Sequence, residues 1–141
     1  MSITNCDMYN QEQKILFRFS ADLDTDFLND LYGDDFQQAQ LIFESTAKQL
    51  RNDITLAKST FHDNDVVGLR KAVHKMKPMF GYTGMNETME LFAGFETDCA
   101  SAQTTTELEK RFYHIIAIVN TAIDKIEIEI IRLKEHNTKH P

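Results

Sequence analysis

The sequence places a lysine, Lys77, one helical turn after a histidine, His74. Imidazole is the one side chain that is substantially neutral and nucleophilic near pH 7. A lysine ammonium is a compact, mobile positive charge that can follow a phosphate as it moves. A mid-helix position has no free backbone N–H groups to hold a phosphate, so a side chain must supply the charge. The pair therefore predicts a site that can accept a phosphoryl group on a ring nitrogen.

The residues around His74 predict a positive surface that a partner can approach closely. Gly81 lies about two turns along and leaves the backbone bare. Pro78 lacks an N–H, so the hydrogen bond back to the carbonyl of His74 is missing and a slight kink is expected. Nearby cations, Lys75 among them, add a positive field in an otherwise acidic chain, which favours a dianion. The predicted docking face consists of Arg70, Lys71, Pro78 and Gly81.

A helix predicted over residues 66–83 must carry His74. Its apolar residues fall within a sector of about 60° when each residue is placed at about 100°; they are Leu69, Val73, Met76 and Phe80. His74 lies more than about 90° from the middle of that sector. The imidazole is therefore expected to face solvent.

The spacing of apolar residues predicts one short helix and three further long ones. They cover residues 25–32, 36–61, 87–102 and 104–134. Four long amphipathic helices with short connections pack most simply as an antiparallel up-down four-helix bundle, and the short N-terminal helix would cap one end. The predicted class is all-α, with the bundle over residues 21–136, an N-terminal extension or linker over 1–20 and a polar tail over 137–141.

Local signals mark the predicted helix ends. Gly33 and Gly84 stand where a left-handed C-terminal residue is wanted, although Gly84 could also serve docking. Asp34 and Asp35 supply an N-cap for the second helix. The last helix is expected to open with a capping box of Thr104 and Glu107 and to fray from Glu135 onward.

Composition excludes several classes of protein. The 141 residues fit one domain, and the net charge of −7 makes nucleic acid a poor partner. Cys6 and Cys99 have no metal-binding spacing, and we expect both to be reduced, as in the cytoplasm. We find no signal peptide and no apolar run long enough to span a membrane, so no direct membrane contact is expected.

The segment from His74 to Met85 resembles the signature of histidine-containing phosphotransfer (HPt) domains. That signature has a His, an apolar residue two later, a Lys three later, a small residue four later, and glycines seven and ten later. The matching residues are His74, Met76, Lys77, Gly81 and Gly84, and Ala72 just upstream is also typical. Pro78 departs from it, because most members carry Gly or Ser there. The resemblance extends over about residues 23–134 through helix order and length, and only the twelve-residue core is diagnostic.

The resemblance implies a role for each matching residue. Members of the family are four-helix bundles that take a phosphoryl group from an aspartyl phosphate and pass it to another aspartate. By that resemblance His74 is the phosphoryl acceptor and Lys77 its electrostatic partner. The implied partners are response-regulator receiver domains and a hybrid sensor histidine kinase.

The chain is expected to be a carrier and not an enzyme. It contains neither GxGxxG nor GxxxxGK[ST], so it has no obvious ATP site and the phosphate must come from a partner. No cofactor is expected in this chain. The Mg²⁺ that neutralises a transferring phosphoryl group wants clustered carboxylates and is expected on the receiver.

Two other functions remain open on the sequence. The chain could be a helical interaction adaptor without chemistry, if the kink at Pro78 spoils access to His74. A metal enzyme of the bundle type would need repeated Glu-x-x-His ligands, which are absent. The one histidine pair with ligand spacing, His136 and His140, lies in the tail that is expected to fray, so no metal site is predicted. The polar ends are compatible with a free-standing protein or with a piece of a hybrid sensor kinase.

Overall fold

The computed structural model describes residues 16–141, and this range is all-helical, as predicted. Its α-helices are α2 (Thr25–Tyr32), α3 (Phe36–His62), α4 (Val66–Tyr82), α5 (Asn86–Ser101) and α6 (Glu109–Lys139), and a short 3-10 helix, η1 (Thr106–Leu108), precedes α6. The helices expected before residue 103 match within one residue at each end. Cys6 and most of the predicted N-terminal extension lie outside the described residues. Within residues 16–141, none of the helices is long and apolar enough to cross a membrane.

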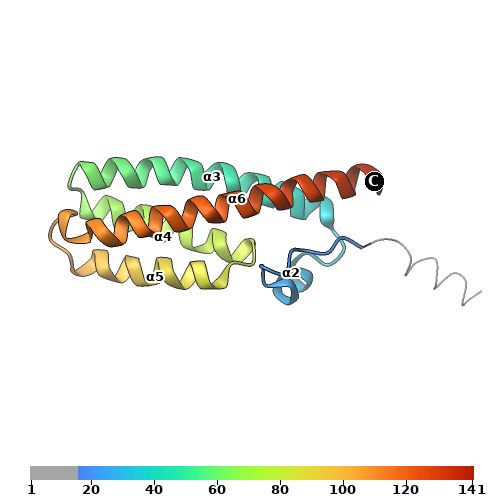
Figure 1. The fold of residues 1–141 in the computed structure, drawn as a ribbon, viewed down its shortest axis with the longest axis horizontal. Helices are drawn as coiled ribbons and strands as arrows, with labels where there is room; N and C mark the ends of the chain where they lie inside the picture. The colour runs from blue at the N-terminus through green and yellow to red at the C-terminus, as the bar shows by residue number, and fades with distance from the viewer. Residues whose placement is uncertain (1–15) are drawn as a thin grey trace, which may run out of the picture.

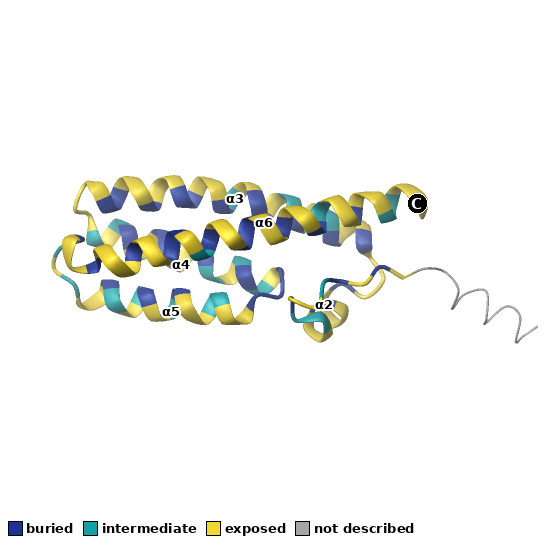
Figure 2. Ribbon diagram, viewed as in Figure 1, coloured by how far each residue is buried: buried dark blue, intermediate teal, exposed yellow. Residues whose placement is uncertain are grey.

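The four long helices lie lengthwise beside one another, with α4 and α6 each packed against both α3 and α5 (Figure 1). Their buried residues face inward and their exposed residues face out (Figure 2). Each helix contributes large apolar side chains to one continuous core, among them Phe43, Leu50, Met76, Phe80, Phe92, Phe112 and Ile126. Removal of this apolar surface from water is the main force that holds the helices together.

Aspartates begin three of the helices. Asp24, Asp35 and Asp65 each accept a hydrogen bond of 2.9–3.1 Å from the backbone N–H three residues further on. Such a cap satisfies one of the N–H groups that the first helical turn leaves without a partner. Of the two aspartates predicted before α3, Asp35 is the cap.

The short helix α2 packs against the residues at the C-terminal end of α4. Gly84 has φ +73°, and a Cβ there would lie 2.8 Å from Cδ1 of Leu28. The backbone N–H of Asp24 donates to the Gly84 carbonyl at 2.8 Å, and the Tyr32 hydroxyl donates to the Tyr82 carbonyl at 2.7 Å. Burial raises the pKa of Tyr32 to about 12, helped by Tyr82, so this hydroxyl stays a donor. Gly84 is thus required by the local backbone and by the packing of α2.

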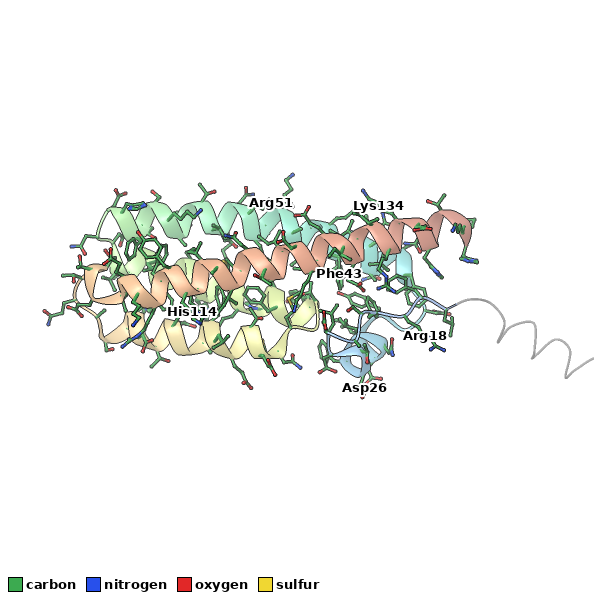
Figure 3. The ribbon with its side chains drawn as sticks, viewed as in Figure 1. Arg18, Asp26, Phe43, Arg51, His114 and Lys134 are labelled. Atoms are coloured by element: carbon green, nitrogen blue, oxygen red, sulfur yellow. The ribbon has the colours of Figure 1, made fainter. Side chains whose placement is uncertain are left out.

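Residues before α2 belong to the core. Phe17 and Phe19 are buried, and the Phe19 ring stacks on Phe43 at 5.8 Å between centroids (Figure 3 labels Phe43). Arg132 of α6 donates to the carbonyl of Arg18 at 2.7 Å. The boundary predicted at residue 20 therefore runs through packed structure.

Two expectations about the last helix were wrong. The tail does not end the helix at Glu135, because α6 continues to Lys139 and the Asn137 side chain donates to the Phe36 carbonyl of α3 at 2.9 Å. The capping box of Thr104 and Glu107 does not form either. The Glu107 carboxylate accepts instead from the backbone N–H of Gln103, and α6 begins only at Glu109.

The neighbouring threonine explains why that capping box is absent. The Thr105 hydroxyl donates to the Phe61 carbonyl at 2.7 Å, and its backbone N–H donates to the Asn64 side chain at 2.8 Å. These bonds fix the start of η1 against the turn between α3 and α4. A contact with a distant turn has replaced the local cap.

Candidate functional site

His74 lies in the middle of α4 and points away from the core. Its side chain is 67% exposed, whereas Leu69, Val73, Met76 and Phe80 of the same helix are buried. The helix therefore has one solvent-exposed face and one buried face, as the helical spacing predicts. The helix continues unbroken through Pro78 to Tyr82, and Pro78 itself is exposed.

A glutamate of the neighbouring helix α5 holds both His74 and Lys77. Nδ1 of His74 lies 2.8 Å from Oε2 of Glu96, and Nζ of Lys77 lies 2.6 Å from Oε1 of the same carboxylate. Glu96 is 22% exposed and Lys77 26% exposed, so their contact is partly shielded from water. The three side chains form one unit, the His74–Glu96–Lys77 cluster.

Glu96 is ionised at neutral pH. Burial acts to raise the pKa of its carboxyl, but hydrogen bonds from Lys77 and His74 outweigh burial and lower the pKa. An ionised carboxylate can only accept hydrogen bonds, so Nδ1 of His74 must carry the proton that joins them. In the neutral ring the lone pair then belongs to Nε2.

The two cations of the predicted docking face differ from the nearby Lys75, which lies outside that face. Arg70 and Lys71 are exposed, and neither forms an ion pair within residues 16–141. Lys75, by contrast, lies 3.5 Å from the buried carboxylate of Asp53 in α3. Arg70 and Lys71 therefore remain available to an acidic partner.

Gly81 is half-buried at the edge of α5, so the backbone of the docking face is less exposed here than predicted. A Cβ at Gly81 would lie 3.6 Å from the sulfur of Met89, which is an ordinary contact distance. At Gly68, in contrast, a Cβ would lie 2.3 Å from a carboxylate oxygen of Asp65. The cap at Asp65 therefore explains the glycine at 68, whereas no such contact explains the glycine at 81.

Glu96 is not among the residues predicted for the site. The available signal was weak: Glu96 follows Phe95 and lies one turn from Phe92 and Cys99, so it borders the apolar face of its helix. A charged residue at such a border can meet a neighbouring helix. Which residue it meets depends on the relative register of α4 and α5, which periodicity does not give.

Neither the thiol of Cys99 nor a preformed group of metal-binding side chains forms a second site in the described residues. Cys99 is buried, and burial, together with Asp98 and Glu96, raises the pKa of its thiol to about 11. Such a thiol is a poor nucleophile. Over residues 16–141, no three His, Cys, Asp or Glu side chains already converge as a metal site would require.

The cluster presents one nucleophilic nitrogen to solvent while it holds a proton on the other. It also keeps an ammonium within one helical turn of that nitrogen. Comparison with protein-family models, curated proteins and solved structures finds no match to this chain.

Proposed function

We propose that this protein is a histidine phosphotransfer module, in which the four long helices form an antiparallel up-down bundle that carries the acceptor His74. The observation that supports the proposal most strongly is the exposed imidazole with Nδ1 tied to Glu96. That arrangement leaves Nε2 free to meet a phosphoryl donor. The donor and the next acceptor are aspartates of response-regulator receiver domains, one of them in a hybrid sensor histidine kinase in the cytoplasm.

The transfer step balances with the groups in the cluster. Nε2 of neutral His74 donates its lone pair to the phosphorus, and the bond from phosphorus to the receiver aspartate breaks. The aspartate leaves as a carboxylate, and the ring becomes a phosphorylated imidazolium that keeps its proton on Nδ1. The ionised Glu96 stabilises this positive ring, 2.8 Å away. The reverse sequence passes the group to a second aspartate.

Lys77 supplies the charge that the phosphoryl group needs. Before transfer it pairs with Glu96, and the rotatable lysine stem lets the ammonium turn toward Nε2 when a dianion arrives. Any Mg²⁺ for this reaction is expected on the receiver, beside its own carboxylates. The protein thus acts as a carrier and has no kinase activity of its own.

Receiver domains dock over the docking face around His74. The exposed cations Arg70 and Lys71 attract the acidic surroundings of a receiver aspartate. Gly81 keeps side-chain bulk away from the approach to Nε2. An adaptor without chemistry would also dock but would accept no phosphate, so one experiment separates the two functions.

Transfer from a receiver domain phosphorylated on its aspartate tests the proposal. We expect acid-labile, base-stable label on the wild-type protein and none on His74→Gln. His114→Gln is the matched control, because His114 is another exposed histidine on a long helix and should leave labelling unchanged. Label that persists on His74→Gln would reject the assigned site, and binding without any label would favour the adaptor.

A further inference from the structure

Two histidines come together at the C-terminal end of α6, far along the rod from the docking face. The His136 and His140 rings lie 4.8 Å apart between centroids, with their planes tilted by 38°. The backbone N–H of His140 donates to the His136 carbonyl at 2.9 Å, which closes the last turn of the helix. Because α6 continues to Lys139, the two rings are held on the ordered end of a helix and not on a frayed tail.

His136 is held in place from its other side. Its ring packs edge-on against Phe36 at 5.1 Å and against Phe17 at 5.7 Å. These two aromatic contacts orient the imidazole of His136 within the recess. A neutral, oriented imidazole is the form that binds metal ions.

A carboxylate shares the same recess. Asp34, in the turn between α2 and α3, lines a cavity of about 420 Å³ together with both histidines. Its carboxylate makes neither a hydrogen bond nor an ion pair with any other part of the chain that the structure describes. Asp35, which lines the cavity too, already caps α3.

We propose that His136 and His140 bind a late first-row divalent cation such as Zn²⁺, Ni²⁺ or Cu²⁺, with Asp34 as a third ligand. Two histidines at positions i and i+4 of a helix present their rings on one face, as in zinc-binding helices. Imidazole suits these ions, and water can fill the remaining positions. Asp34 reaches the ion by rotation of its exposed side chain, which accounts for the absence of a preformed three-ligand site in residues 16–141. The ion would join α6 to the turn before α3.

Titration of the full-length protein with Ni²⁺, followed by calorimetry, tests this site. Mutation of a residue that only hydrogen-bonds to a metal ligand typically lowers metal affinity about 10–100-fold. Removal of a direct ligand in His140→Ala should therefore weaken Ni²⁺ binding by at least about tenfold. His140 is exposed at the end of the helix, and this variant should therefore fold normally. Asp34→Asn should weaken binding too, and unchanged affinity in that variant would remove Asp34 from the ligand set.

Two controls make the result specific. His114→Ala and His74→Gln remove exposed histidines elsewhere and should leave the Ni²⁺ affinity unchanged. Ni²⁺ should broaden NMR signals of the last turn of α6 and of Phe17 and Phe36. Equal affinity of the wild type and His140→Ala, or loss of binding in His74→Gln, would overturn the proposal. None of these outcomes depends on phosphotransfer.

Discussion

Glu96 decides which nitrogen of His74 faces solvent. Its carboxylate accepts a hydrogen bond from Nδ1 at 2.8 Å, and the second oxygen holds the ammonium of Lys77 at 2.6 Å. A single side chain on α5 therefore fixes the tautomer of one residue and the position of another on α4. The chemistry proposed for His74 depends on this arrangement as much as on the histidine itself.

Removal of the Lys77 ammonium should slow phosphoryl transfer without unfolding the protein. A hydrogen bond to a charged group contributes about 1.5–3 kcal/mol, so Lys77→Ala should reduce the rate of His74 phosphorylation roughly 10–100-fold. Lys125→Ala, which removes an exposed lysine of α6, should leave the rate unchanged. Rapid-quench measurements with a phosphorylated receiver, alongside circular dichroism, check both points. An undiminished rate in Lys77→Ala would reject the electrostatic role.

The cluster should also make stability depend on pH. Because the pKa of Glu96 is lowered from 4.5 in the folded state, its contribution is fully present above the unfolded value. It is lost as the pH falls through the lower folded value. We expect Glu96→Gln to be less stable than the wild type at pH 7, and the gap in free energy of unfolding to shrink below pH 4.5.

Urea unfolding over this pH range provides the measurement. Glu90→Gln removes an exposed carboxylate of the same helix and is the matched control. It should show no comparable gap at neutral pH. A gap for Glu96→Gln that stays constant down to the most acidic samples would contradict the ion-pair account.

The sequence predicted His74 and Lys77 as a pair because both lie on one helix, where spacing alone sets their geometry. It could not predict Glu96, because that contact crosses from α5 to α4 and depends on how far the two helices slide past each other. The same limit applies to Lys75, which looked like a free cation and pairs with the buried Asp53 of α3.

At the scale of helices, a side chain at Gly81 should affect helix packing and partner docking differently. A Cβ at this position fits beside Met89 at an ordinary contact distance, so the α4–α5 interface tolerates a side chain. A larger side chain would extend from the interface onto the face that carries His74. A bulky side chain at position 81 should therefore reduce the rate of phosphoryl transfer and leave folding nearly unaffected.

Gly81→Leu should block receiver docking and leave helix content nearly unchanged. Gly94→Leu is the matched control, since a Cβ at Gly94 meets nothing within 4 Å and both changes remove a helical glycine. Circular dichroism should find both variants folded, and a transfer assay should find only Gly94→Leu active. Normal transfer in Gly81→Leu would show that the face needs no open backbone.

Helix limits were predictable where local chemistry sets them. Asp35 and Gly84 mark ends that follow from a cap and from a positive φ. The start of α6 was missed because Thr105 bonds to the distant turn at Phe61 and Asn64. The end of α6 was missed because Asn137 gains partners on α3, which no local pattern reveals.

At the scale of the whole molecule, the residues before α2 complete the core. Helices α3 and α6 extend beyond α4 and α5 (Figure 1). The buried rings of Phe17 and Phe19 pack on α3 there, against Phe36 and Phe43. Buried Glu129 accepts from the backbone N–H of Ser20 and pairs with Arg132, which anchors this segment to α6. The segment therefore stabilises the end of the molecule opposite the α3–α4 turn.

Truncation of Phe19 should be strongly destabilising. Deletion of a buried phenylalanine side chain costs about 3–5 kcal/mol, and Phe19 is only 6% exposed, so we expect Phe19→Ala to lose stability of this order. Leu16→Ala, at a residue 60% exposed, should change the free energy of unfolding little. Denaturant unfolding of both variants provides the comparison. Equal stability of the two would show that the segment before α2 lies outside the core.

The nitrogen that takes the phosphoryl group tests the account most directly. Protein with ¹⁵N-labelled histidine can be phosphorylated by a receiver domain and examined by ¹H–¹⁵N and ³¹P NMR. We predict phosphorus on Nε2 of His74, with the proton retained on Nδ1 beside Glu96. Phosphorus on Nδ1 of His74, on another histidine or on none would contradict it.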